Sequence, residues 1–274
     1  GDVYKRQTMI RAAELLGREQ DAIRFRQLAE KIKRSYNTKF FHPDTKSYDR
    51  GSQAANAIAL CAGLVAPDDE RAVAENIAAD IRARGNALTA GDVGYNFVLR
   101  ALEAHGMSEV IYVMNSRYDV PGYGYQIARG ATALPETWDA RTDHSHNHLM
   151  LGHLQEWFYT QVGGIQRDPQ SPAYKRFIVK PAVVGGITFA RTSFESPYGT
   201  ISTGWETTPG GFRMKVAVPA NTTAQIWIPA APDDTVTESG IRADRASGVR
   251  HLFDAGGYKV YEAGGGTYRF AAGN

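Results

Sequence analysis

The residues best suited to chemistry lie between positions 121 and 157. This stretch combines glycines, tyrosines, tryptophans and carboxylic acids in what look like long loops between helices. Aromatic rings stack on the apolar faces of sugars, glycines let a ligand approach the backbone, and carboxylates transfer protons. The composition of residues 121–157 is therefore typical of a sugar-binding site with acid–base chemistry.

Glu136 is the first candidate for that chemistry. It follows six uncharged residues and stands beside Pro135, with Trp138 two positions further on. An apolar setting desolvates a carboxylate and raises its pKa, as a general acid or base requires. A glutamate that caps or packs against the end of a helix has similar neighbours, so spacing alone leaves both interpretations open.

Three further side chains are candidates for binding a ligand. Tyr123 and Trp138 are candidates for stacking on a sugar ring, although aromatic residues in such positions more often belong to the core. His148 shares an expected helix with Leu151, so it is either a ligand contact or a core histidine with a satisfied ring.

Alternate histidines at positions 144, 146 and 148 raise the possibility of a zinc site. Such spacing suits a strand or loop, whereas near a helix start the pair His144 and His148, four residues apart, suits zinc better. We favour the interpretation without a metal, and the sequence indicates no cofactor.

Helices are predicted over residues 8–165, and they must position these candidates. Apolar residues recur at helical spacing across residues 20–40. Ser52 can cap a helix that ends at Gly63, and Pro67 with three following acids marks another helix start. Further helices are expected at 92–105, 108–114 and 145–162. The last is apolar over much of its circumference, which predicts burial on several sides and favours a double ring of helices.

The hydrophobic period changes from 3.6 to 2 after residues 166–169. Alternating or β-branched segments separated by Gly and Pro indicate a β-sandwich. They lie at 175–180, 187–195, 200–205, 212–218 and 224–228, with shorter ones near 251, 258–261 and 267–270. We therefore expect a partial (α/α)6 toroid at 8–165 and an antiparallel β-sandwich at 166–274, after a non-native or truncated leader at 1–7.

Composition excludes several classes of protein. The 274 residues are 43% hydrophobic and 22% charged, with a net charge of +2 and no basic stripe, so nucleic acid is not an expected partner. No apolar run approaches the roughly 18 residues of a membrane span. The single cysteine, Cys61, stands in an apolar run and is expected to be a small core residue.

Taken together, several motifs resemble the bacterial α-L-rhamnosidases of glycoside hydrolase family 78. The resemblance covers most of residues 45–206 in the family's order. It is carried by residues 48–55, 84–91, 130–138, 147–148, 156–159, 163–165, 174–175 and 194–199.

The resemblance implies an (α/α)6 barrel with a C-terminal β-sandwich that releases terminal α-L-rhamnose with inversion, from an oligosaccharide or a glycoside. It places Glu136 at the general base and His148 at a sugar contact. Tyr123 stands where many members carry a stacking tryptophan, Trp138 and Asn147 join the sugar-binding residues, and Glu156 supports them.

Three features depart from the family pattern: Pro135 replaces a bulkier residue, the loop at 136–148 is short, and residues 92–94 differ from the usual apolar run. The acidic cluster that supplies the general acid in this family lies upstream of this chain. We therefore expect no activity from the chain alone.

Two other hypotheses fit parts of the pattern. A polysaccharide lyase with a helical toroid would use a tyrosine or histidine base and neutralise a uronate. A non-catalytic carbohydrate-binding module would bind the sugar without turnover.

Overall fold

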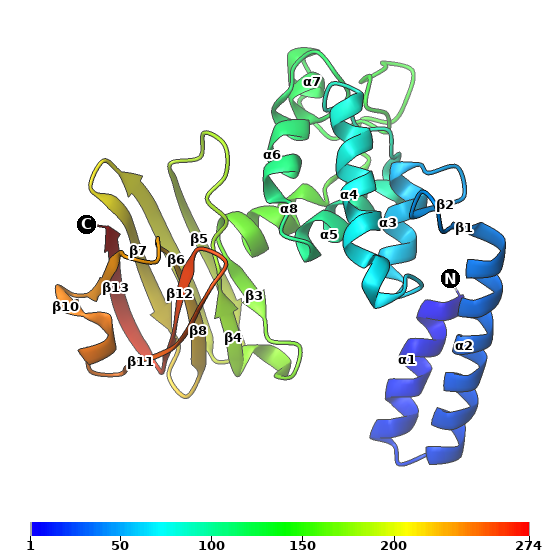
Figure 1. Ribbon diagram of the computed structural model, residues 1–274. Helices are drawn as coiled ribbons and strands as arrows, with labels where there is room; N and C mark the ends of the chain where they lie inside the picture. Colours follow the sequence, from blue (N-terminus) through cyan, green and yellow to red (C-terminus); the bar gives the residue numbers. More distant parts are fainter. Residues whose placement is uncertain (1, 274) are drawn as a thin grey trace. The chain divides into compact units, whose positions relative to one another are not determined.

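The computed structural model describes residues 2–273 and divides into two compact units. The first ends at His153 and the second begins at Leu154, whereas the change of sequence pattern places the boundary at residues 165–166. The first unit is built of helices and the second of two β-sheets (Figure 1). No helix in the described part of the chain is long and apolar enough to span a membrane.

The helices of the first unit form where sequence patterns place them, with additions at both ends. The predicted helix at 20–40 is α2, which pairs with α1 in an N-terminal hairpin (Figure 1). A short β-hairpin of two strands follows α2. The elements are α1 (Asp2–Leu15), α2 (Glu19–Phe40), β1 (Phe41–His42), β2 (Ser47–Tyr48), α3 (Gln53–Cys61), α4 (Pro67–Ala83), α5 (Asp92–Ala104), α6 (Ser108–Ser116) and α7 (Tyr123–Ala128).

Helix starts in this unit follow the expected capping chemistry. The Oγ of Ser52 accepts a hydrogen bond from the N–H of Ala55 at 3.2 Å, which satisfies a donor at the start of α3. Pro67 stands in the first turn of α4, and the stripe formed by Val73, Ile77 and Ile81 is fully buried. These local predictions are confirmed.

Helix α7 is absent from the sequence-based prediction, and two glycines explain how it packs. A Cβ atom on Gly122 would lie 2.4 Å from the carbonyl oxygen of Met114, and one on Gly124 would lie 2.4 Å from that of Arg117. The missing side chains therefore let the start of α7 approach the end of α6 closely. These glycines serve packing between the two helices.

The single helix predicted over 145–162 is wrong. The segment contains a 3₁₀ turn (Leu149–Leu151), the short α8 (Leu154–Trp157) and a π-helical turn (Phe158–Val162). Leu151 and Trp157 are buried, but Leu149 is 79% exposed and Phe158 43% exposed, so burial on several sides is also wrong. A helix cannot begin at Ser145, because residues before Leu149 donate hydrogen bonds to a preceding loop.

The second unit consists of a six-stranded and a five-stranded sheet, as the expected β-sandwich requires. Their orders are β10-β9-β13-β7-β6-β5 and β11-β12-β8-β4-β3. The strands are β3 (Ile165–Arg167), β4 (Arg176–Val179), β5 (Phe189–Ser196), β6 (Gly199–Thr208), β7 (Gly211–Val218), β8 (Thr223–Pro229), β9 (Thr235–Glu238), β10 (Ile241–Arg242), β11 (Val249–Ala255), β12 (Tyr258–Ala263) and β13 (Gly266–Gly273).

One pair of strands departs from the antiparallel expectation. Strands β4 and β8 are parallel, with Phe177 opposite Ala224. The chain between β4 and β8 forms β5, β6 and β7 of the other sheet. Because a long connection and not a hairpin joins β4 to β8, the two strands can run in the same direction. Sequence alternation locates strands but does not fix the direction of pairing between strands that are far apart.

Alternating side chains fill the interior of the β-unit and also hold the segment that precedes β3. Trp205 on β6 is 3% exposed, and its Nε1–H donates to the carbonyl of Val162 at 2.7 Å. The hydroxyl of Thr203 donates to the carbonyl of Gly163 at 2.6 Å. Two side chains of one strand therefore bind consecutive carbonyls at the end of the π-helical turn.

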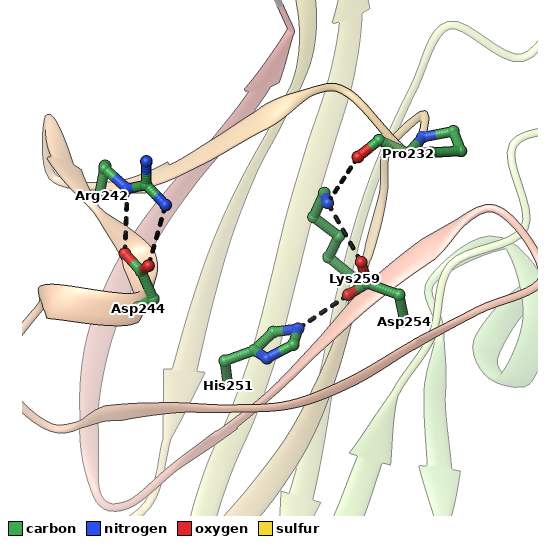
Figure 2. Close-up of polar contacts among 6 residues, drawn as sticks. All are labelled: Pro232, Arg242, Asp244, His251, Asp254 and Lys259. Atoms are coloured by element: carbon green, nitrogen blue, oxygen red, sulfur yellow. Dashed lines mark hydrogen bonds and ion pairs between the residues drawn. The ribbon is translucent and has the colours of Figure 1, made fainter.

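Polar contacts tie together two strands and a loop near the C-terminal end of the sequence. Figure 2 shows Asp254 between His251, at 2.8 Å, and Lys259, at 3.2 Å, while Lys259 also donates to the carbonyl of Pro232. The hydrogen bond with His251, followed by that with Lys259, lowers the pKa of Asp254 below its ordinary value. This network links β11, β12 and the loop before β9.

Candidate active site

The candidate residues of the first unit gather on a loop at residues 134–148, which two backbone hydrogen bonds close. The N–H of Glu136 donates to the carbonyl of Ser145, and the N–H of His148 donates to the carbonyl of Leu134, both at 2.8 Å. We call this segment the 134–148 loop. These two bonds fix the backbone of Glu136, the expected general base, relative to that of His148, the expected sugar contact.

Glu136 is exposed at the edge of this loop. Its Oε2 accepts a hydrogen bond from the N–H of Ser145 at 3.3 Å, and its neighbour Pro135 is buried. Apolar neighbours in the sequence predict a desolvated carboxylate, and that prediction is wrong for the described chain. Pro135, and not Glu136, is the buried residue of this pair.

His148 is fixed by a carboxylate that sequence reasoning did not select. Its Nε2 lies 3.1 Å from Oδ2 of Asp92, and 23% of its side chain is exposed. Asp92 is the first residue of α5, where the helix dipole favours a negative charge. The hydrogen bond with His148, and then that from the N–H of Val93, lowers the pKa of Asp92. The histidine is therefore partly accessible and oriented, rather than enclosed in the core.

This pair predicts how the first unit responds to acid. A carboxylate whose pKa is lower in the folded state stabilises the fold above its ordinary pKa, and that contribution is lost as pH falls through the folded value. We expect Asp92→Asn to reduce the free energy of unfolding at neutral pH, and the deficit relative to the unmodified chain to shrink below about pH 4. Urea unfolding of both chains, from neutral pH to below about pH 4, measures this difference in the free energy of unfolding.

Asp44→Asn, which alters an exposed turn between β1 and β2, is the matched control for that measurement. A deficit for Asp92→Asn that stays constant down to about pH 2 would contradict the role of this carboxylate.

Tyr123 and Trp138 lie together in an aromatic cluster with Tyr95. Trp138 meets Tyr95 edge-on at 5.0 Å between ring centroids and Tyr123 at 5.8 Å. Its Nε1–H donates to the carbonyl of Ala90 at 2.7 Å. Tyr95 is fully buried and its hydroxyl donates to Asn115, whereas Tyr123 and Trp138 remain partly exposed. The cluster thus anchors two partly accessible rings on a buried third.

Gln126 links α7 to the 134–148 loop. This side chain is only 3% exposed, and its Nε2 donates to the carbonyl of Thr137 at 3.2 Å. The bond fixes the backbone next to Glu136. Sequence reasoning missed Gln126 as it missed Asp92 and Tyr95, since nothing in local spacing connects these residues to the loop.

The two remaining candidates have separate positions. Asn147 is exposed on the 134–148 loop, and its N–H donates to the hydroxyl of Ser145 at 3.2 Å. Glu156 belongs to α8 in the second unit, where it is exposed and its carbonyl accepts a bond from Thr160. The structure brings together Glu136, His148 and Asn147 on one loop of the first unit.

The histidines that suggested zinc face different partners. His144 Nδ1 lies 3.1 Å from a carboxylate oxygen of Asp143, and His146 Nε2 lies 3.0 Å from the carbonyl of Arg141. Within the residues that the structure describes, no three histidine, cysteine or acidic side chains form a group able to hold a metal.

Comparison with known families decides the identity. Residues 3–162 match the model of the bacterial alpha-L-rhamnosidase 6 hairpin glycosidase domain, and residues 164–242 match that of the bacterial alpha-L-rhamnosidase C-terminal domain. The chain belongs to the bacterial α-L-rhamnosidase family. The resemblance stated from the motifs is confirmed, and so is the fold of helices followed by a β-sandwich.

Similar individual proteins support the same family assignment. An α-L-rhamnosidase of Streptomyces avermitilis is 32% identical over 269 residues, which are 95% of this chain and 25% of that protein. The crystal structure of the Streptomyces avermitilis enzyme complexed with L-rhamnose superposes with a TM-score of 0.86 at 30% identity, covering 98% of this chain and 26% of that one. The α-L-rhamnosidase from Dictyoglumus thermophilum gives a TM-score of 0.89 at 29% identity, covering 99% and 31%. This rhamnosidase-family chain thus spans about a quarter of the curated relatives it matches.

Proposed function

We propose that this chain is the C-terminal portion of an inverting glycosidase that releases terminal α-L-rhamnose from a rhamnose-containing oligosaccharide or glycoside. Membership of the family supports the reaction class. The observation that carries the proposal is the closed 134–148 loop, which holds Glu136 and His148 in one frame beside two partly exposed aromatic rings. The exposed carboxylate is one of the two carboxyl groups that hydrolysis of a glycoside needs, and the oriented imidazole and the two rings are groups that can hold the sugar.

In this proposal Glu136 is the general base. Its carboxylate takes a proton from a water molecule as the water oxygen attacks the anomeric carbon, on the face opposite the leaving oxygen. A carboxylate has several acceptor sites, so the bond from the N–H of Ser145 orients Glu136 while an oxygen lone pair remains for the water. The anomeric configuration is inverted because a single displacement occurs.

His148, Tyr123, Trp138 and Asn147 bind the sugar in the same proposal. When Nε2 of His148 carries the proton donated to Asp92, its Nδ1 is an acceptor for a sugar hydroxyl. Asp92 therefore fixes both the orientation and the tautomer of the ring. The exposed portions of the two aromatic rings offer apolar surface to the sugar, and Glu156 keeps a supporting role.

The general acid that protonates the leaving oxygen is proposed to come from residues outside this chain. An inverting pair of carboxyl groups stands about 6.5–9.5 Å apart with the sugar and the water between them. We expect the purified 274-residue chain to hydrolyse no aryl α-L-rhamnoside, and the longer protein to do so with β-L-rhamnose as its first product. Release of the aryl group measures hydrolysis, and NMR of the fresh product gives the anomeric configuration of the released rhamnose.

Other outcomes of the same assay contradict the proposal. Substantial turnover by the 274-residue chain would contradict the missing acid, and α-L-rhamnose as first product would contradict inversion. Unsaturated products that absorb ultraviolet light would indicate a lyase. Calorimetric binding of rhamnose without any turnover by the longer protein would indicate a binding module.

A further inference from the structure

The outer face of the six-stranded sheet carries a broad hollow of about 1060 Å³ in the second unit. Along β6, β7 and β13, alternate residues are buried between the sheets, and several of the others line the hollow together with exposed residues of β5. The floor is therefore a sheet face, and its side chains follow from the strand register. This face is distinct from the 134–148 loop, which belongs to the first unit.

A row of cations crosses this hollow. Arg191 on β5 lies opposite Gly204 on β6, which lies opposite Lys215 on β7, which in turn lies opposite Arg269 on β13. Neighbouring strands are about 4.8 Å apart, so Arg191 and Lys215 start about 10 Å apart with Gly204 between them. All three basic side chains are exposed. The row is an elongated positive track across the strands.

These cations differ from others in the same unit. Arg176 pairs with Asp168 at 2.9 Å and Arg250 with Glu262 at 2.7 Å. Within the described residues, neither Arg191, Lys215 nor Arg269 forms such an ion pair. Exposed cations left without partners in a hollow attract anions.

The remaining lining favours a sugar as the carrier of that anion. Gly204 leaves the middle of the row without a side chain, and the space above it is open, since a Cβ there would lie 3.6 Å from its nearest neighbour, Arg191. Ser193 and Ser202, opposite each other in the next row, provide hydroxyl groups. Phe189 is 65% exposed at one end of the hollow, where an aromatic ring can stack on a sugar face.

We propose that this face binds an acidic polysaccharide through its uronate carboxylates. Guanidinium groups match the planar carboxylate with two parallel hydrogen bonds, and a track across the strands accommodates an extended chain. The presence of Glu206 in the hollow favours a polymer with spaced single charges over a densely sulfated one or a nucleic acid. This binding is independent of the proposed hydrolysis and would hold the protein on its polymer.

Titration of the 274-residue chain with polygalacturonate tests the proposal. Calorimetry should detect binding that weakens as salt is raised. The double variant Lys215→Gln with Arg269→Gln should lose about tenfold or more in affinity and show a weaker dependence on salt. Arg191→Gln, on another strand of the row, provides an independent variant in case the double variant does not fold.

A matched variant removes the same charge elsewhere. Lys31→Gln with Arg34→Gln changes two exposed cations of α2 and should leave the affinity unchanged within about twofold. Equal losses in both double variants would overturn the proposal, as would no binding of polygalacturonate by the unmodified chain. Tighter binding of dextran sulfate or of a single-stranded oligonucleotide would also overturn it, because either would assign the face to another polymer.

Discussion

Glu136→Gln in the longer protein is expected to lower kcat on an aryl α-L-rhamnoside by about 10²-fold or more. Glutamine keeps the shape of the side chain and can still accept a hydrogen bond from the N–H of Ser145, but it cannot take a proton from water. The loss should fall on kcat, with KM nearly unchanged, because sugar contacts are assigned to other residues.

Azide separates a base from a positioning residue in this experiment. Azide attacks without losing a proton, so it should restore turnover in Glu136→Gln and form a glycosyl azide of inverted configuration. Glu70→Gln, an exposed carboxylate in the first turn of α4, should retain the activity of the unmodified protein. Near-native kcat in Glu136→Gln would remove the carboxylate from the mechanism.

Trp205→Ala is expected to destabilise the β-unit by about 3–5 kcal/mol. The side chain is 3% exposed and stacks on Phe212 at 5.9 Å. Its removal also leaves the carbonyl of Val162 without its indole donor, which adds the cost of an unsatisfied buried acceptor. Urea denaturation followed through the unfolding transition of the β-unit measures this loss.

Trp205→Phe separates the contribution of apolar packing from that of the hydrogen bond to Val162. Phenylalanine keeps most of the apolar contact and loses only the Nε1–H donor, so its deficit should be about 1–3 kcal/mol. A deficit below about 1 kcal/mol for Trp205→Ala would show that neither the packing nor the bond to Val162 stabilises the unit.

The sequence predicts elements best where the signal is local. Ser52 and the acids after Pro67 mark helix starts through contacts within one turn, and both helices form. Alternating strands from β5 to β8 are found for the same reason. The residues of β9 and β10 form short strands between turns, and the pairing of β9 with β13 is a tertiary contact that no local pattern contains.

The predictions that fail depend on contacts between distant residues. Hydrophobic spacing favours a helix over 145–162, but the bond between His148 and Leu134 commits the start of that segment to a loop. Asp92 and His148 are far apart in sequence, and only the fold brings them together. The exposure of Glu136 likewise depends on which neighbour points inward. Assigning roles to Glu136 and His148 therefore required resemblance to a family as well as spacing.

The two backbone bonds of the 134–148 loop also separate its stem from its tip. Residues 139–144 lie between the anchored Trp138 and Ser145, which bonds to Glu136, so insertions or deletions at this tip need not displace Glu136 or His148. Loops closed in this way tolerate changes in length. Evolution, or a designer who grafts a longer tip, can thus alter what surrounds the sugar while leaving the positions of these two residues untouched.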